Sequence, residues 1–166
     1  MTPPMAKKMG IFKFLDKPVD FNKKLKGRPV LGSHKTWRGI VLGIAVGVSI
    51  AYFQSWIYKF PLIREISFLN YRKENVLLLG FLLSGGAVFG DLCFAFLKRR
   101  LQLKPGAKFL PFDQTNYVIG AALFFSLTGL FEIDILVWPT LFILSFFLHI
   151  IINRVGYNLK FHQAKW

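Results

Sequence analysis

Four long runs of apolar residues alternate with polar and charged stretches along the chain. The runs cover residues 40–58, 76–96, 115–131 and 135–152. A helix needs about 20 apolar residues to cross the ~30 Å hydrocarbon core of a bilayer. The first two runs reach that length, and the last two are shorter, with Glu132 and Asp134 in a tight polar turn between them. The pattern therefore predicts an all-α, polytopic membrane protein with about four transmembrane helices.

The composition supports a membrane protein and excludes several soluble classes. Hydrophobic residues make up 54% of the chain and charged residues 18%, whereas an average soluble domain is about 25% charged. The single cysteine, Cys93, excludes a disulfide framework and a cysteine-based zinc site. A net charge of +14 is typical of proteins that bind nucleic acid, but such proteins are rarely this apolar, so we expect no nucleic-acid partner.

Lysine and arginine are concentrated in alternate polar segments. Residues 1–38 carry ten, residues 97–116 carry five and the tail from residue 153 carries three, against four in residues 59–75 and none in residues 132–134. Because cytoplasmic loops are enriched in Lys and Arg, this bias places both termini and the loop 97–114 in the cytoplasm. We expect a basic cytoplasmic arm, residues 1–38, followed by a transmembrane domain, residues 39–166.

The segment from Gly32 to Gly39, Gly-Ser-His-Lys-Thr-Trp-Arg-Gly, precedes the first apolar run. Lys35 and Arg38 are cations and Thr36 adds a hydroxyl group, a combination that suits a polyphosphate. The residue order of a P-loop is missing. The alternative interpretation is a basic anchor that binds anionic lipid at the membrane surface.

Asp91 lies inside the second apolar run, where a carboxylate is costly unless it is paired or hydrated. An acid in such a place is a functional candidate, and the alternative is a structural ion pair. Lys98 is a candidate partner, since it lies nearly two helical turns further on, about 10 Å along the axis. Gly86 and Gly90 predict close packing against another helix, and they would also leave room for a cavity beside Asp91.

A strongly basic loop follows, and a second acid, Asp113, opens the third apolar run in a position typical of a helix cap. Two carboxylates that flank a cationic loop fit Mg²⁺, which binds one or two carboxylates together with substrate phosphates. The alternative is a capping Asp113 beside an ordinary basic loop. The cations of the loop are Lys98, Arg99, Arg100, Lys104 and Lys108.

Four segments of the chain resemble the CDP-archaeol synthase family, the archaeal relatives of membrane phosphatidate cytidylyltransferases. They are Lys17–Asp20, Leu31–Gly39, the stretch from Gly90 through Lys98 and Gly106 to Gln114, and the tail from His149 to Trp166. The resemblance implies a CTP-dependent cytidylyltransferase that transfers CMP from CTP to a lipid phosphate, with Mg²⁺, at the cytoplasmic face of the cell membrane. In archaea the lipid is an unsaturated bis-geranylgeranyl glycerol phosphate, and the products are CDP-archaeol and pyrophosphate.

The resemblance also implies roles for individual residues. Asp91 and Asp113 would bind the metal, and Lys98 and Arg99 would stabilise charge on the phosphates. The expected catalytic residues are therefore Asp91, Lys98, Arg99 and Asp113, within a catalytic domain at residues 39–166. The expected substrate-binding residues are Lys35, Thr36, Arg38, Lys104 and Gln114.

Three features depart from the family pattern. Ser33-His34 replaces an acid and a glycine, and Asn116 stands where the family has a second aspartate. Asn116 still offers a carbonyl ligand to the metal, with one charge fewer. The family also has an additional N-terminal span, which we expect this chain to lack.

Other functions remain open from the sequence. An ordinary diacyl phosphatidate is the competing substrate. A small membrane transporter subunit that uses Asp91 as an ion relay is a rival from another class. A membrane-anchoring module with a nucleic-acid-binding arm is a third. The expected partners are CTP, a lipid phosphate and the bilayer, and a homodimer is left open.

Overall fold

A computed structural model describes residues 12–103, 109–129 and 134–158 of the chain. Most of these residues belong to long helices, with short elements at their ends. The long helices are α2 (Trp37–Ile57), α4 (Val76–Arg100), α5 (Phe112–Thr128) and α6 (Val137–Asn158). The short elements are the 3-10 helix η1 (Lys13–Leu15), the antiparallel strands β1 (Lys24–Leu25) and β2 (Arg28–Pro29), and the helix α3 (Pro61–Glu65).

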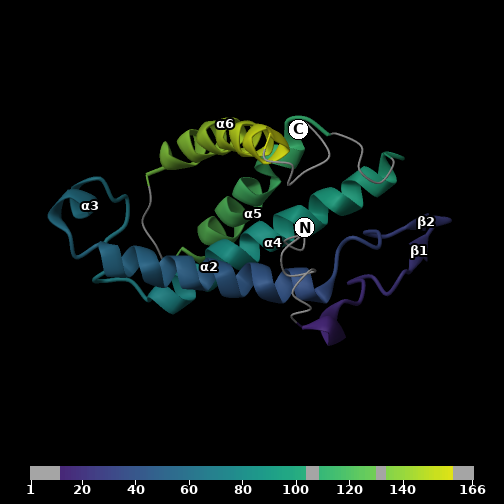
Figure 1. The fold of residues 1–166 in the computed structure, drawn as a ribbon, viewed down its shortest axis with the longest axis horizontal. Helices are drawn as coiled ribbons and strands as arrows, with labels where there is room; N and C mark the ends of the chain where they lie inside the picture. The colour runs from purple at the N-terminus through teal and green to yellow at the C-terminus, as the bar shows by residue number, and fades with distance from the viewer. Residues whose placement is uncertain (1–11, 104–108, 130–133, 159–166) are drawn as a thin grey trace.

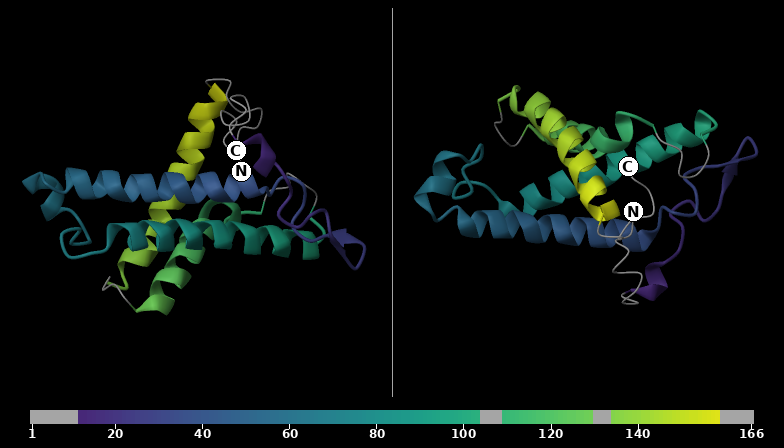
Figure 2. Two further views of the ribbon diagram at one scale, coloured as in Figure 1. Left: turned by 90° about the horizontal axis from the view of Figure 1, so that it is seen from below. Right: turned by 45° about the horizontal axis from the view of Figure 1, so that its top comes forward.

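The long helices form a bundle in which α4 has the most neighbours (Figure 1). α2 and α4 lie side by side and antiparallel, α5 packs against α4, and α6 packs against α5. α6 crosses the α2–α4 pair obliquely (Figure 2). We call the end of the molecule where α2 begins, α4 ends and β1 and β2 lie the basic end.

Three helices, α2, α4 and α6, are long and apolar enough to cross a membrane. The remaining long helix, α5, has 17 residues, and Gly129 ends it with a left-handed φ of 58°. The prediction of an all-α, polytopic membrane protein is confirmed. By length and composition, the described residues contain three complete spans rather than four.

The helix ends differ from the ends of the apolar runs. α4 continues through Lys98, Arg99 and Arg100, past the expected end at residue 96. Lys and Arg are good helix formers, and their charge is favourable in the last turn of a helix. α5 begins at Phe112 rather than at residue 115, so the expected loop 97–114 is shortened from both sides.

The contact between α4 and α5 is made of backbone. Gly90 lies against the backbone carbonyl of Asn116, and Gly86 and Gly120 lie against each other. A Cβ atom on Gly86 would come within 2.6 Å of the Gly120 carbonyl oxygen, so a larger residue would push the helices apart. The close packing predicted from Gly86 and Gly90 is confirmed, and the partner helix is α5.

Backbone hydrogen bonds fold the arm onto the start of α2. The N–H of Val19 donates to the carbonyl of Lys35 at 2.8 Å, and the N–H of Trp37 donates to the carbonyl of Lys17 at 3.1 Å. Residues 17–19 therefore pair with residues 35–37 in the manner of two strands. This pairing fixes the backbone on both sides of Thr36, which caps α2.

Asp20 organises the loop that leads back to α2. Its buried carboxylate accepts hydrogen bonds from the backbone N–H groups of Leu31 at 2.8 Å, Gly32 at 3.0 Å and Asn22 at 3.0 Å. Burial raises the pKa of Asp20, but the N–H groups of Gly32, Leu31 and Asn22 outweigh burial and hold the pKa below its ordinary value. The charged carboxylate is thus the form that stabilises the arm.

Arg100 attaches the strands β1 and β2 to the end of α4. Its guanidinium donates to the carbonyl oxygens of Leu25 at 2.8 Å and Pro29 at 2.6 Å. Arg28 returns a hydrogen bond to the Arg100 carbonyl at 3.3 Å. The arm is therefore fixed to both α2 and α4, two of the helices that carry the candidate site.

Candidate active site at the basic end

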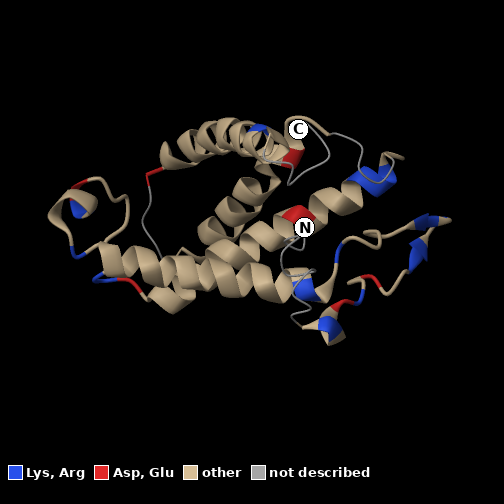
Figure 3. Cartoon of the chain, in the orientation of Figure 1, with Lys and Arg blue, Asp and Glu red and all other residues tan. Residues whose placement is uncertain are grey.

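Positive charge gathers at the basic end of the molecule (Figure 3). Lys and Arg follow β1, β2 and the last turn of α4, while the middle of each long helix carries almost no charge. Two acids enter the helices here, Asp91 in α4 and Asp113 in the first turn of α5. Each acid binds a lysine from a different element.

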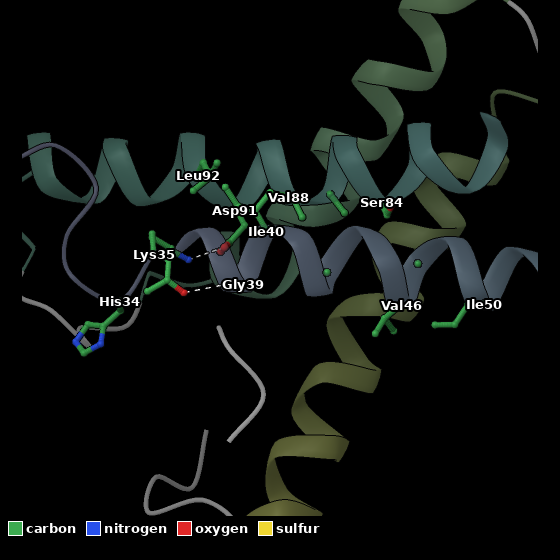
Figure 4. Close-up of a pocket in the computed structure, with 14 residues that line it drawn as sticks. His34, Lys35, Gly39, Ile40, Val46, Ile50, Ser84, Val88, Asp91 and Leu92 are labelled. Carbon is green, nitrogen blue, oxygen red and sulfur yellow. Dashed lines mark hydrogen bonds and ion pairs between the residues drawn. The ribbon is translucent and has the colours of Figure 1, made fainter. Parts of the chain in front are cut away.

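Asp91 is paired with Lys35. The Lys35 Nζ lies 2.6 Å from Asp91 Oδ2, and the two side chains are 19% and 35% exposed. Lys35 directly precedes the cap of α2, so the start of α2 delivers the amine to the side of α4 (Figure 4). From helical spacing, Lys98 was a candidate partner of Asp91. In the structure the ion pair of Asp91 is with Lys35.

Lys98 binds the second acid, Asp113. Its Nζ lies 3.0 Å and 2.9 Å from the two carboxylate oxygens, and the side chains are 13% and 31% exposed. Asp113 also accepts a hydrogen bond from the N–H of Phe109 at 2.9 Å. The alternative that Asp113 caps α5 is wrong, because Pro111 occupies the cap position and Asp113 lies inside the first turn. An acid is still favourable there, since it faces the positive end of the helix dipole.

A cavity of about 360 Å³ lies between α2 and α4. One end contains the Lys35–Asp91 pair, and the other end is lined by apolar side chains together with Ser84, whose hydroxyl donates to the Gly80 carbonyl (Figure 4). The polar end is lined by His34, Lys35, Thr36 and Asp91. The remainder is lined by Gly39, Ile40, Gly43, Val46, Gly47, Ile50, Ser84, Ala87, Val88 and Leu92.

Two of the expected phosphate-binding residues hold the fold together. Arg38 is 2% exposed, and its guanidinium lies 2.8 Å from Asp16, so its charge fixes the arm. The Thr36 hydroxyl accepts a hydrogen bond from the N–H of Gly39 at 3.3 Å and caps α2. Both residues therefore position Lys35, which lies between the arm and α2.

Arg99 lies beside the glycine that begins the expected phosphate-binding segment. A Cβ atom on Gly32 would be 3.9 Å from Arg99 Nε, and this Nε is buried without a hydrogen-bond partner among the described residues. Arg99 also donates to the carbonyl of Leu103 at 2.7 Å. The fold thus places Gly32, at the start of this segment, beside the last turn of α4. Lys104 lies outside the described residues.

The first five residues of α5 include three buried polar residues, Gln114, Thr115 and Asn116. Gln114 Oε1 is buried and accepts no hydrogen bond within the part of the chain that the structure describes. Together with Asp91 and Asp113, these residues supply carboxylate and amide oxygens, the donors that a hard cation such as Mg²⁺ prefers. The donor types therefore fit Mg²⁺, although no group of three acidic, His or Cys side chains forms within the described ranges.

Two features of the site were missed from the sequence, and one expectation about it was wrong. The glycines of α2 that line the cavity, Gly39, Gly43 and Gly47, recur at every fourth position, and this spacing was visible in the sequence. Gly86 and Gly90 were expected to leave room beside Asp91, but they face α5 and do not line the cavity. The pairing of Lys35 with Asp91, 56 residues apart, had no local signal.

Comparison with known proteins identifies the family. The family model for CarS-like CDP-archaeol synthases matches residues 3–166. A CDP-archaeol synthase of Archaeoglobus fulgidus is 38% identical and one of Sulfurisphaera tokodaii is 33% identical; each match covers 90% of this chain, and 84% and 81% of the relative. A solved intramembrane enzyme of archaeal membrane lipid biosynthesis superposes with a TM-score of 0.68 at 25% identity, over 82% of this chain and 78% of the other. This chain therefore belongs to the CDP-archaeol synthase family.

Proposed function

We propose that this chain transfers the CMP group of CTP to the phosphate of an unsaturated bis-geranylgeranyl glycerol lipid, giving CDP-archaeol and pyrophosphate. Family membership makes the chain an enzyme and sets aside the transporter alternative. We place the reaction at the basic end because two lysine–carboxylate pairs lie there, Lys35–Asp91 and Lys98–Asp113. Both pairs are partly exposed, so substrates can reach them.

The reaction needs positioning and charge neutralisation more than acid–base chemistry. An oxygen of the lipid phosphate, already anionic, attacks the α-phosphorus of CTP. A new P–O–P bond forms, the bond from the α-phosphorus to its bridging oxygen breaks, and pyrophosphate leaves with that oxygen. No proton has to be removed from the nucleophile, so the reaction does not require a general base.

Cationic side chains would allow two polyanions to approach each other. We assign the lysines Lys35 and Lys98 and the guanidinium of Arg99 to the phosphates. Arg38 would act indirectly, because it holds Asp16 and the arm, and Thr36 would act by capping α2. The substrate-binding roles of Gln114 and Lys104 stay predictions.

Mg²⁺ would be held by the carboxylates of Asp91 and Asp113. Gln114 or Asn116, which follow Asp113 closely in the sequence, would offer an amide oxygen. When bound, Mg²⁺ supplies charge neutralisation on the phosphate oxygens. Asp91 and Asp113 each have one lysine partner now, so they can accept a cation as the lysines turn to phosphate. Metal chelation before the assay should therefore abolish transfer.

We further propose that the basic end faces the cytoplasm, as the distribution of Lys and Arg indicates. A background variant, Cys93→Ala, removes the exposed native thiol. Into this background we introduce, in separate variants, Ser33→Cys at the basic end or Ser67→Cys at the opposite end, so that each variant has one thiol. An impermeant thiol reagent added to intact cells should label residue 67 alone, and labelling of residue 33 would reverse the orientation.

Transfer of label from CTP into lipid tests the activity directly. The purified chain is given Mg²⁺ and either the isoprenoid ether phosphate or a diacyl phosphatidate. We expect label in the ether lipid, and equal labelling of both lipids would favour the phosphatidate alternative. Asp91→Asn and Asp113→Asn should lose most turnover while remaining folded, whereas the matched Asp134→Asn at the opposite end should not. Wild-type protein that labels neither lipid would refute the proposal.

A further inference from the structure

The segment that connects α2 to α4, at the end of the molecule opposite the basic end, exposes large apolar side chains. We call this segment, residues 58–75, the cap; it contains α3 and lies beyond the end of α2 (Figure 1). Exposure of single apolar side chains is ordinary, whereas a group of them marks an interaction site. Within nine residues of the cap, four large apolar side chains are between 55% and 70% exposed: Phe60, Leu62, Ile66 and Phe68.

Polar contacts hold the cap in a defined shape. The hydroxyl of Tyr71 donates to Gln54 Oε1 at 3.0 Å, and the hydroxyl of Tyr58 donates to Asn70 Oδ1 at 3.4 Å. The guanidinium carbon of Arg64 lies 5.7 Å from the centre of the Tyr58 ring. These contacts attach both α3 and the segment after it to the last turn of α2. The apolar surface of the cap therefore belongs to an ordered structure.

A chain of aromatic contacts joins this surface to the outside of α2. The rings of Phe53 and Trp56 stack with their centroids 6.0 Å apart, and Trp56 meets Phe60 edge-on at 6.4 Å. Phe53 and Trp56 are both more than half exposed, on a helix that is long and apolar enough to cross a membrane. In a bilayer their rings face lipid, and the same apolar surface continues through Phe60 onto the cap.

Two tryptophans mark the level of the cap relative to the bilayer. Trp37 and Trp56 lie nineteen residues apart in α2, a rise of about 29 Å. That rise matches the ~30 Å hydrocarbon core, and Trp is enriched at both interfaces of a membrane. With Trp37 at the interface of the basic end, Trp56 lies at the other interface. The contact between Trp56 and Phe60 brings the cap to this second interface.

We propose that the cap binds the lipid surface of the leaflet opposite the basic end. Its exposed apolar side chains lie among the headgroups and the first segments of the hydrocarbon chains, as in other interfacial elements. Lys and Arg lie on and beside α3, where they suit the phosphate groups of lipid (Figure 3). In the cap they outnumber Asp and Glu by four to two. This binding does not depend on the reaction at the basic end.

A second copy of the chain is the competing occupant of this surface. A protein bound to the cap would replace lipid along only part of a continuous apolar surface that runs from Phe53 to Phe60. Lipid covers the whole of that surface without a break, and so we favour it. Because the headgroup region is hydrated, the thiol of a Ser67→Cys variant stays accessible to water-soluble reagents.

Quenching by spin-labelled lipid tests the contact. In the Cys93→Ala background, Leu62→Cys and the control Lys24→Cys each carry one fluorophore, and the full chain is placed in vesicles of equal parts phosphatidylcholine and phosphatidylglycerol. Lys24 is exposed in β1, which projects beyond the start of α2 (Figure 1). A nitroxide near the start of a lipid hydrocarbon chain should quench the fluorophore at position 62 several-fold more strongly than at position 24. Equal quenching at the two positions would overturn the proposal.

A second position and a cross-linking measurement separate lipid from a second copy. Phe68→Cys repeats the quenching measurement further along the cap, in case Leu62→Cys disturbs α3. Oxidation of the unlabelled Leu62→Cys variant with copper phenanthroline in the same vesicles should leave the chain monomeric on a non-reducing gel. Disulfide-linked dimers together with weak quenching at both positions would assign the cap to contact between copies and overturn lipid binding.

Discussion

Replacing Asp20 by asparagine should loosen the arm, and with it the loop that carries Lys35. The carboxylate of Asp20 holds the N–H groups of Leu31 and Gly32 through one oxygen and that of Asn22 through the other. An amide has a single acceptor oxygen, so its NH₂ group must face at least one of these N–H donors. The loop that carries Lys35 would then lose its support.

The size of the effect follows from the hydrogen bonds that are lost. A hydrogen bond to a charged group contributes about 1.5–3 kcal/mol, and a neutral one about 0.5–1.5 kcal/mol. In the best orientation asparagine keeps the bonds from Leu31 and Gly32 as neutral bonds and loses the bond from Asn22. The arm should therefore lose about 3.5–6 kcal/mol of local stability, on the order of 300-fold or more in its opening equilibrium.

The pH dependence of the arm gives a second, independent signature. Because the pKa of Asp20 is lowered in the folded arm, the carboxylate contributes its full stabilisation above its ordinary pKa of about 3.9. The contribution declines as the pH falls from there through the lowered pKa. The Asp20→Asn variant has no such group, so the stability of its arm should not show this acid step.

Hydrogen–deuterium exchange in detergent micelles measures both effects. After correction for intrinsic exchange rates, the amides of Leu31 and Gly32 should exchange at least ten-fold faster in Asp20→Asn at neutral pH. Asp134→Asn is the matched control, because among the hydrogen bonds described the Asp134 carboxylate accepts one only, from the N–H of Leu136 two residues further on. Unchanged protection in Asp20→Asn would refute the idea that this carboxylate anchors the arm.

Two further predictions concern the helix contacts. Gly90→Ala should lower the free energy of unfolding in detergent by about 1–3 kcal/mol, because the new methyl group overpacks against Asn116. Gly85→Ala places its methyl group in open space, so it should leave the free energy of unfolding unchanged or raise it by up to about 1 kcal/mol. Equal stability of the two variants would contradict the backbone contact. In a double-mutant cycle of Lys35→Met and Asp91→Asn, the partly exposed ion pair should give a coupling energy of about 1–2 kcal/mol, and strict additivity would mean that the pair contributes nothing.

Hydropathy predicted the long helices because burial in a membrane needs long apolar runs. It misplaced the end of α4, since an apolar run stops at the first Lys while helix propensity continues to Arg100. It gave no sign of β1 and β2, apart from the Lys26-Gly27 turn between them. Both residues of that turn have positive φ, and the strands are held by Arg100, more than 70 residues away. Such a long-range anchor leaves no periodic pattern in the sequence.

The chemistry of the candidate site was visible residue by residue, but its pairing was not. Asp91 stood out because an acid in an apolar helix is costly. Lys35 stood out because of its glycine-flanked segment. That these two meet depends on the arm, where Asp20 and the pairing of residues 17–19 set the direction of Lys35. Tertiary contacts of this kind lie beyond the reach of local spacing rules.

The two ion pairs are linked through α4, which contributes the acid to one and the lysine to the other. α2 brings Lys35 to Asp91, and α5 brings Asp113 to Lys98. The glycine contact at Gly86, Gly90 and Gly120 sets the position of α5 on α4, so it also sets where Asp113 meets Lys98. Four charges thus compensate one another within the chain at a membrane boundary where an unpaired charge would be costly. The same arrangement suits the proposed reaction, because phosphates can compete for the lysines while a divalent cation competes for the carboxylates.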